Sequence, residues 1–380
     1  MNTFKFLNFL KKGDKMYFDV TMAEQKDYIE KLSIPKDDFE RSFNQYKCQR
    51  FFSTAAKGTI LNMAAIPLLP SLVFIYYVKY LFGKSYCNHI DAIGEFKGMP
   101  EIVPETLNQE FEINNELWFE NVELNFSDIK YIFHLCRYFY APYFIVKLVA
   151  KIARYSYTIS HHTPRAIIVH DEYSYTSSVL TNYCEHRKVE HIDVMHGEKL
   201  YYIGNSFFRF TRTYIWGEHY RNLFLDLKAC PNQFIIEIPR CFRINIKDSF
   251  DKRYSADYKY YLQIYTEDQL KSIISSMKFA EDKGAKVVYR PHPRFSNISL
   301  LERLVPKAQI EYPREVPIMA SIASSKFIVG SFSTVLNQAY YSGKQIIFDD
   351  VTCLNEYNKL ADLRYIFSKN DGLRLSSFQK

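Results

Sequence analysis

The chain has 380 residues, of which 47% are hydrophobic and 24% charged, so it can bury a large core and suits two domains of ordinary size. Its formal net charge of +7 favours anionic ligands, but the sequence shows no nucleic-acid-binding module, and we expect no nucleic acid partner. The seven cysteines form no Cys-x-x-Cys pair, which argues against a disulfide scaffold or a zinc site and indicates a reducing compartment.

Residues 1–88 are predicted to be mostly helical. The apolar run at 4–10 is short and interrupted and lacks a small-residue cleavage site, so we expect no signal peptide and a cytoplasmic protein. The run at 59–82 approaches a membrane span in length, but Pro67 and Pro70 are expected to break it. We therefore interpret it as buried core helices, and any membrane contact as peripheral, at the cytoplasmic face of the inner membrane.

The rest of the first half alternates between strand and helix patterns. A polar linker is predicted at 100–115, and basic amphipathic helices at 129–159, divided near Pro142. The predicted strands are 89–93, 166–170, 192–195, 214–216 and 233–238, and the predicted helices between them are 175–188 and 218–227. Strand, helix and strand in succession predict a parallel α/β sheet.

A charged, irregular segment at 240–258 separates this series from a second one. The second series is predicted to contain strands 260–265, 286–289, 309–312, 327–329 and 345–348, and helices 268–283, 299–304, 316–324 and 333–341. The sequence therefore predicts an α/β protein with two Rossmann-like domains whose parallel sheets face a central cleft. We place the domains at 1–245, with a helical N-terminal region, and at 246–380.

A proline-fixed histidine follows one strand of the second series. Pro291 and Pro293 exclude a helix and hold His292 out from the carboxyl end of the strand, between Arg290 and Arg294. In an open parallel sheet, this edge is where ligands bind.

A second loop with anion-binding chemistry follows the strand at 327–329. Gly330 permits a sharp turn, Ser331 comes next, and Ser333 and Thr334 stand at the start of a helix. Free N–H groups and hydroxyls at a helix start form an anion site. The two loops together predict one nucleotide-phosphate site.

Candidate bases follow two strands of the first half. His196 and Glu198 come after the strand at 192–195, and Asp171 and Glu172 come after the strand at 166–170. Any of them could take a proton from an acceptor hydroxyl if its pKa lies near the working pH. The choice among the four stays open. Hydrolase-elbow, P-loop and dinucleotide fingerprints are absent from the sequence, as is metal-ligand spacing, so we expect no metal and no bound cofactor.

The Arg290 to Arg294 segment and the Gly330 to Thr334 segment resemble the His-Pro motif and the Ser/Thr motif of bacterial sialyltransferases and polysialyltransferases, which have the two-Rossmann architecture called GT-B. The pattern is similar to that of capsule Kdo transferases and CDP-glycerol glycerophosphotransferases. The likeness is good from about 259 to 350 and loose before that.

The resemblance implies a cytidine nucleotide donor. It also implies that His292 contacts the donor phosphate and helps the nucleotide leave, and that Ser331, Ser333 and Thr334 bind the same phosphate. Arg290, Pro293, Arg294 and Gly330 complete the expected donor site. The base motif of sialyltransferases is an acidic pair followed by glycine, whereas a tyrosine follows Asp171 and Glu172, which leaves the base and the sialic acid donor open.

Three functions are therefore considered. The first is a metal-independent, inverting glycosyltransferase that moves a sugar, sialic acid or Kdo-like, from a CMP-activated donor to a surface glycan or glycolipid of capsule or lipopolysaccharide. The second is transfer of a polyol phosphate from CDP-glycerol, with His196 as the favoured base. The third is a non-catalytic, transferase-like subunit that binds glycan.

Overall fold

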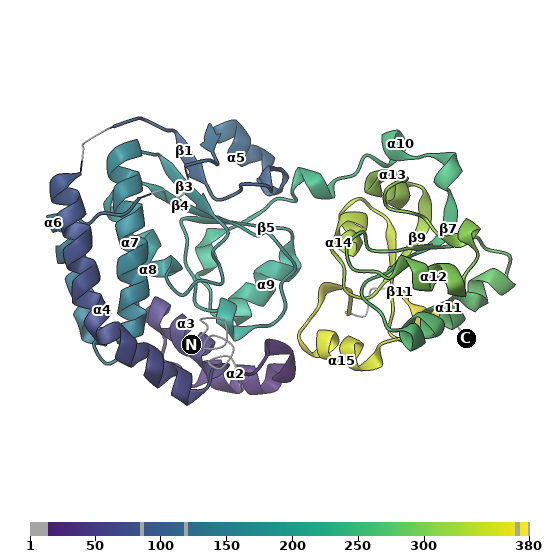
Figure 1. Cartoon of the computed structure of the whole chain (residues 1–380), viewed down its shortest axis with the longest axis horizontal. Helices are drawn as coiled ribbons and strands as arrows, with labels where there is room; N and C mark the ends of the chain where they lie inside the picture. Colours follow the sequence, from purple (N-terminus) through teal and green to yellow (C-terminus); the bar gives the residue numbers. More distant parts are fainter. Residues whose placement is uncertain (1–13, 84–86, 118–120, 369–372, 379–380) are drawn as a thin grey trace. The chain divides into compact units, whose positions relative to one another are not determined.

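The computed structural model describes residues 14–83, 87–117, 121–368 and 373–378. The chain divides into two compact units, each described here by itself (Figure 1). Unit 1 contains Met1–His196 and Tyr201–Glu237, and unit 2 contains Gly197–Leu200 and Ile238–Lys380. The short segment Gly197–Leu200 is thus grouped with unit 2 although it lies between two parts of unit 1 in the sequence.

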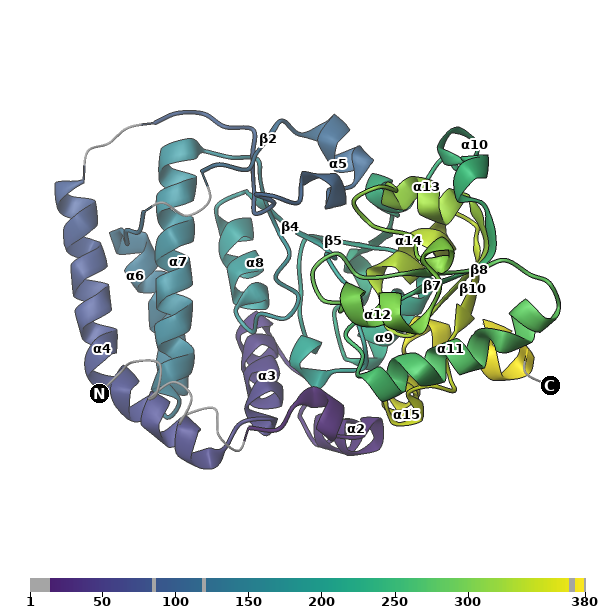
Figure 2. The ribbon, with the colours of Figure 1, turned by 45° about the vertical axis from the view of Figure 1, so that its right-hand side comes forward.

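Unit 1 is built on a six-stranded sheet in the order β2-β1-β3-β4-β5-β6, and every neighbouring pair is parallel. Its strands are β1 Ala92–Gly94, β2 Ile113–Asn114, β3 Ala166–Val169, β4 Glu190–Val194, β5 Arg212–Ile215 and β6 Phe234–Ile236. Its helices are α2 Met22–Glu30, α3 Asp38–Phe51, α4 Ala55–Phe82, α5 Glu105–Glu110, α6 Phe126–Phe133, α7 Pro142–His162, α8 Ser177–His186 and α9 Glu218–Asp226. The long helices α4 and α7 run side by side, as Figures 1 and 2 both show.

Unit 2 has a five-stranded sheet in the order β11-β10-β9-β7-β8, again parallel throughout. Its strands are β7 Ala256–Tyr261, β8 Val287–Arg290, β9 Ser325–Gly330, β10 Gln345–Phe348 and β11 Leu373–Arg374. Its helices are α10 Ile246–Ser249, α11 Glu267–Asp282, α12 Ile298–Leu304, α13 Ile318–Ala323, α14 Thr334–Tyr341 and α15 Leu354–Asp362. The two parallel sheets with their helices confirm the predicted pair of Rossmann-like α/β domains, the composition of a GT-B fold.

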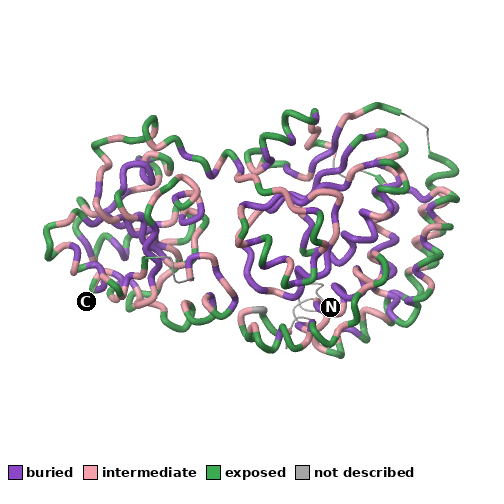
Figure 3. Tube along the Cα trace, turned by 180° about the vertical axis from the view of Figure 1, so that it is seen from behind, coloured by how far each residue is buried: buried purple, intermediate pink, exposed green. Residues whose placement is uncertain are grey.

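The core of each unit lies against its sheet, where the buried segments of Figure 3 gather. In unit 2, Ile273 and Met277 of α11 pack with Tyr289 of β8 and Val329 of β9, and all four side chains are fully buried. These strands are β-branched and aromatic, which suits a strand covered by helices on both faces. Helix α11 begins at a capping box in which Thr266 and Gln269 bond each other's backbone N–H groups.

The prediction of broken, buried helices at 59–82 is wrong. Residues 55–82 form the single helix α4, which contains Pro67 and Pro70, and only 11% of its most apolar 18-residue window is buried. It is long and apolar enough to cross a membrane by length and composition. Figure 1 shows that α4 bends along its length, as in-helix prolines cause a helix to do. The Ser71 hydroxyl donates to the Pro67 carbonyl at 3.0 Å, an extra bond beside these prolines.

Two smaller predictions are also wrong. The predicted strand at 309–312 forms only an isolated bridge from Ile310 to Tyr289, preceded by a 3-10 helix, Lys307–Gln309. The predicted linker at 100–115 contains helix α5 and strand β2. Both segments are too short for hydrophobic periodicity to identify them.

Candidate nucleotide-phosphate site

Unit 2 contains a cavity of about 620 Å³ at the carboxyl edge of its sheet. The segments that line it follow β7, end β8 and follow β9, so it lies where parallel α/β sheets bind ligands. The cavity brings together six of the predicted site residues: Glu198, Arg290, His292, Pro293, Ser333 and Thr334. Ser331, Arg294 and Gly330 are close in sequence to this set but are not part of the lining.

His292 is held as a hydrogen-bond donor toward the cavity. The backbone N–H of Arg294 donates to Nδ1 of His292 at 3.1 Å, so Nδ1 acts as the acceptor. In the neutral ring, the proton must then be on Nε2. Burial, and then the charge of Arg294, lower the pKa of His292 below its usual value, which favours this neutral form. The ring therefore offers an Nε2–H to a ligand near neutral pH.

The loop around His292 is fixed by local bonds. The Ser296 hydroxyl accepts from the His292 N–H at 2.8 Å and donates to the Gln263 carbonyl at 2.8 Å, which ties the loop after β8 to the loop after β7. The Phe295 ring stacks on the His292 ring with centroids 4.5 Å apart. The prolines that extend this loop could be recognised in the sequence, whereas Ser296 and Phe295 were not predicted.

Helix α14 starts at the cavity. Ser333 is its N-cap, and the Ser333 hydroxyl accepts from the Val335 N–H at 3.3 Å. Thr334, the first residue of the helix, is exposed and lines the cavity. The free N–H groups and the dipole of a helix start favour a phosphate at this position. The Ser331 hydroxyl instead bonds the Tyr265 hydroxyl at 2.9 Å.

The space around Gly330 would admit a Cβ in ordinary van der Waals contact, so packing alone does not require glycine at this turn. A Cβ there would lie 3.4 Å from the Tyr261 carbonyl oxygen and 3.5 Å from a methyl group of Leu336.

A buried charged cluster stands behind the cavity. Glu311 accepts from Arg290 at 2.7 Å and from Lys259 at 2.5 Å, and it also bonds the Ser321 hydroxyl. Arg290 donates a further bond to the Val316 carbonyl at 2.8 Å. One carboxylate is thus shared by two cations, which leaves a formal charge of +1.

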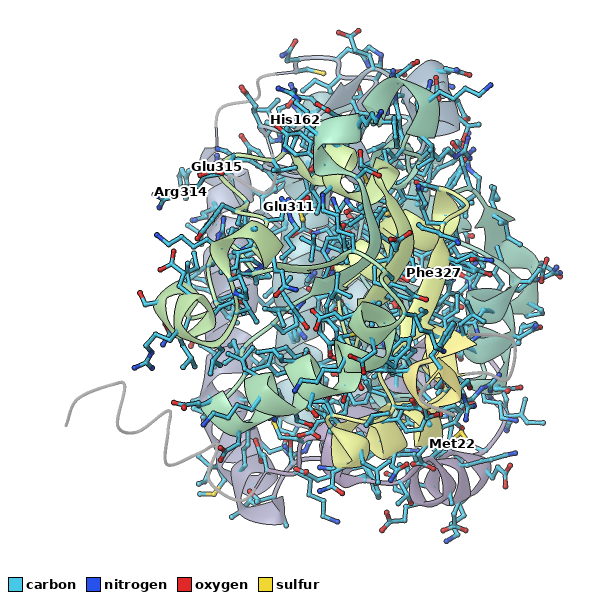
Figure 4. The ribbon with its side chains drawn as sticks, turned by 90° about the vertical axis from the view of Figure 1, so that its right-hand side faces the viewer. Met22, His162, Glu311, Arg314, Glu315 and Phe327 are labelled. Atoms are coloured by element: carbon cyan, nitrogen blue, oxygen red, sulfur yellow. The ribbon has the colours of Figure 1, made fainter. Side chains whose placement is uncertain are left out.

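This cluster changes the role of Arg290. The guanidinium predicted to grip phosphate is 6% exposed and bonded to Glu311, although Arg290 still lines the cavity. Burial lowers the pKa of Lys259, and Glu311 opposes that shift. In Figure 4, Glu311 lies inside the molecule, whereas Arg314 and Glu315 of the same segment point outward. A lysine in the middle of a buried strand was the sequence signal for this cluster, but neither Lys259 nor Glu311 was predicted as part of the site.

Glu198 belongs to the same cavity. Its Oε2 accepts from Nδ2 of Asn337 at 2.9 Å, and Asn337 lies in the first half of α14. This candidate base, read from the first half of the sequence, therefore lies with the predicted phosphate residues in unit 2.

Of the three remaining candidate bases, all in unit 1, His196 and Glu172 lie together, whereas Asp171 has another partner. Nδ1 of His196 lies 3.9 Å from Oε1 of Glu172, and the His196 side chain is 27% exposed whereas Glu172 is 1% exposed. The rings of His170 and His196 are 4.5 Å apart. Trp216 donates to the Met195 carbonyl at 3.1 Å, which fixes the strand end just before His196. At 3.9 Å the carboxylate is beyond hydrogen-bonding distance of the imidazole, so Glu172 acts on the partly exposed ring through its charge.

Asp171 is bound differently from its neighbour. Its carboxylate is paired with Lys151 of α7, and its backbone N–H donates to Asp193 at 2.9 Å. Burial raises the pKa of Asp171, but the charge and the hydrogen bond of Lys151, together with His191 and His170, lower it, and the net pKa is below its ordinary value. A carboxylate held in this way is a poor proton acceptor.

Among the residues that the structure describes, no His, Cys, Asp or Glu side chains gather in groups of three or more that could hold a metal ion. The sites described above consist of hydrogen-bond donors, hydroxyls and paired charges.

No protein-family model matches the sequence, and no curated protein matches it. Among solved structures, the chain is similar to the glycosyltransferase of kitacinnamycin, with 9% identity, 77% of this chain and 88% of that chain covered, and a TM-score of 0.43. It is also similar to the wall teichoic acid polymerase TagF in a structure with CDPG, with 8% identity, 83% and 80% covered, and a TM-score of 0.36.

A third similar structure is the UDP-GlcNAc 2-epimerase of Methanocaldococcus jannaschii, with 12% identity and a TM-score of 0.35. The match covers 53% of this chain and 65% of the epimerase, just under two thirds of its length. At these identities and scores, we base neither the fold nor the function on the similarities. The fold assignment rests on the two sheets and their connections.

Proposed function

We propose that the protein is a glycosyltransferase that moves a sugar from a CMP-activated donor, sialic acid or Kdo-like, to a surface glycan or glycolipid of capsule or lipopolysaccharide. The observation that carries this proposal is the convergence of His292 and the α14 N-terminus on one cavity at the sheet edge. Both present hydrogen-bond donors, and a nucleotide phosphate is the anion that such donors fit. The positive cluster behind them adds a charge of the right sign.

The chemical step follows from these contacts. The bond between the anomeric carbon of the sugar and the phosphate oxygen breaks, and the electron pair leaves with CMP. The Nε2–H of His292, the hydroxyls of Ser333 and Thr334, and the start of α14 stabilise the phosphate as its charge grows. In this scheme the protein itself supplies the positive charge, so the transfer is metal-independent and needs no cofactor.

The acceptor oxygen attacks the anomeric carbon on the face opposite the departing phosphate and forms the new glycosidic bond, while its proton passes to a base on that side. This attack inverts the configuration. We propose His196 as this base, because the buried Glu172 stands behind its ring and part of the ring is exposed. Glu198 lines the donor cavity itself and is the second candidate. Asp171 is the last of these candidate bases, because its carboxylate is paired with Lys151.

The donor is tested by the thermal stability of the full chain with CMP, CDP, UDP and GDP, and with cytidine as the control without phosphate. We expect CMP to raise the melting temperature and cytidine to leave it nearly unchanged. Stabilisation by UDP and not by CMP would contradict the cytidine assignment.

The reaction is tested by release of CMP from CMP-sialic acid and CMP-Kdo, beside turnover of CDP-glycerol. Release from a CMP-sugar supports the proposal. Turnover of CDP-glycerol alone would make the protein a polyol-phosphate transferase that uses the same phosphate contacts. Binding of CMP with no turnover of any donor would support the non-catalytic, glycan-binding alternative.

A further inference from the structure

One face of unit 1 exposes an unusual number of large apolar side chains. Five on α4 are more than half exposed, namely Met63 at 66%, Ile66 at 63%, Phe74 at 68%, Leu81 at 54% and Phe82 at 83%. Phe133 on α6 is 74% exposed, and further aromatic residues that follow α6 are exposed as well. An exposed apolar patch of this size marks a surface that is covered in the functional state.

The same face contains an apolar groove of about 710 Å³. It lies between α4, α6, the 3-10 helix His134–Tyr138 and the start of α7. Leu69 and Val73 line it from α4, Ile132 from α6 and Ile145 from α7. A groove with such a lining suits a hydrocarbon chain.

The exposed charged side chains of α4 and α6 have one sign. The sequence of α4 contains no Asp or Glu, and Lys79 near its end is exposed. On α6, Lys130 is exposed, whereas the acid Asp128 is buried and bonds Arg187 and Ser156. An anionic surface would therefore meet apolar side chains and lysines, without a facing carboxylate from either helix.

Helix α4 is tied to the rest of unit 1 along its inner side. The Asn62 side chain accepts from the Tyr143 N–H at 3.1 Å, and the Leu124 N–H donates to the Tyr76 carbonyl at 3.1 Å. Its neighbour α7 runs alongside (Figure 2). A helix with one long side attached to a folded domain cannot cross a bilayer alone, but its other side can enter the outer part of a leaflet.

We propose that the face formed by α4, α6 and His134–Tyr138, here called the α4–α6 face, binds the surface of a bilayer rich in anionic phospholipid. The exposed aromatic and aliphatic side chains enter the leaflet, the groove takes one acyl chain, and Lys79 and Lys130 meet the headgroups. Charge complementarity favours this occupant over a second copy of the chain, because a second copy would bring the same lysines to the contact. The inference does not depend on the proposed reaction.

The test is co-sedimentation of the full chain with vesicles of phosphatidylcholine alone and of phosphatidylcholine mixed with phosphatidylglycerol. We expect binding to the mixed vesicles and a loss of about tenfold or more in partitioning for the double variant Phe74→Glu, Phe133→Glu, since each exposed ring contributes apolar area. The double variant Lys79→Gln, Lys130→Gln should weaken binding to the mixed vesicles by several-fold at low salt.

The matched control is the double variant Ile34→Glu, Phe250→Glu, which introduces the same charge at exposed apolar positions outside this face, 90% and 52% exposed. It should bind vesicles as the native chain does, and circular dichroism should show that all variants remain folded. Equal loss in this control would overturn the proposal. So would a dimer in lipid-free buffer that the Phe74→Glu, Phe133→Glu variant dissociates, because the face would then be a contact between copies.

Discussion

The backbone N–H of Arg294 donates to Nδ1 of His292, and this single bond sets what the imidazole can do. A ring whose Nδ1 accepts presents Nε2–H to its surroundings, and the lowered pKa favours the neutral ring near pH 7. His292 is thus a fixed donor beside a helix start, and phosphate is the ligand that both features share.

His292→Ala should weaken CMP binding by about tenfold to a hundredfold, the usual cost of losing a hydrogen bond to a charged group. Binding of cytidine should be unchanged, because the lost contact is to phosphate. His292→Gln should restore part of the affinity, since its amide can place a donor near the position of Nε2. Calorimetry with CMP and cytidine measures both effects. An equal loss for both ligands would mean that His292 supports the cavity and does not contact phosphate.

The cap of α14 allows helix stability to be separated from phosphate binding. Ser333→Asp keeps an N-cap acceptor, so stability should change little, but its negative charge should repel a phosphate and abolish detectable CMP binding. Ser333→Ala should cost about 1 kcal/mol of stability through loss of the cap. The matched control is Thr266→Asp at the cap of α11, which does not line the cavity. Unchanged CMP affinity in Ser333→Asp would rule out phosphate at this helix.

The cluster around Glu311 predicts a large stability effect in unit 2. Glu311→Gln leaves Arg290 and Lys259 buried without a carboxylate, and breaking a buried ion pair in this way costs about 3–5 kcal/mol. Adding Lys259→Met should recover part of this loss, because one of the two cations is then removed. Hydrogen exchange of amides in β7, β8 and β9 is the measurement. Faster exchange in the double variant than in Glu311→Gln would contradict the shared-carboxylate account.

These residues show what the sequence could predict. Strands β8, β9 and β10 were recognisable because each contains a short apolar run bounded by a turn signal, and the His292 and Ser333 loops could be placed because they follow β8 and β9. The prediction missed β11, and it placed at 260–265 the strand that the structure has at Ala256–Tyr261. The role of Arg290 could not be predicted, because its partner Glu311 lies on an irregular segment that only the folded sheet brings beside it.

The incorrect prediction of broken helices at 59–82 has another cause. Proline predicts a helix break from local geometry, and the packing of α4 along α7 overrides it.

The choice of base can be tested by the separate effects on kcat and on CMP affinity. His196→Ala should lower kcat by about a hundredfold or more with CMP affinity unchanged, and Glu172→Gln should lower kcat less, since Glu172 acts on the ring only through its charge. Asp171→Asn should act mainly on stability, because it breaks the pair with Lys151. A larger loss of kcat in Glu198→Gln than in His196→Ala would move the base to the donor cavity.

The buried His191 is expected to make the stability of unit 1 sensitive to acid. The ring is fully buried, its nitrogens bond the hydroxyls of Tyr155 at 2.9 Å and Thr181 at 2.8 Å, and burial lowers its pKa from 6.5 to about 3. In the unfolded chain His191 binds a proton below about pH 6.5, but in the folded chain it does so only near pH 3. The unfolded state therefore holds more protons across this window, and stability falls as pH falls.

At about pH 5 the cost from His191 is about 2 kcal/mol. His191→Gln keeps polar contacts but cannot be protonated. When the pH is lowered from about 7.5 to 5, the free energy of unfolding of this variant should therefore fall by about 2 kcal/mol less than that of the native chain. Urea unfolding followed by the fluorescence of the buried Trp216 reports on unit 1, and the exposed His186, changed to Gln, is the matched control. Near pH 5 the buried His191 takes up a proton only when unit 1 unfolds, so removing it must reduce the loss of stability if it governs the response. If His191→Gln and His186→Gln lose stability equally on acidification, groups other than His191 govern the response.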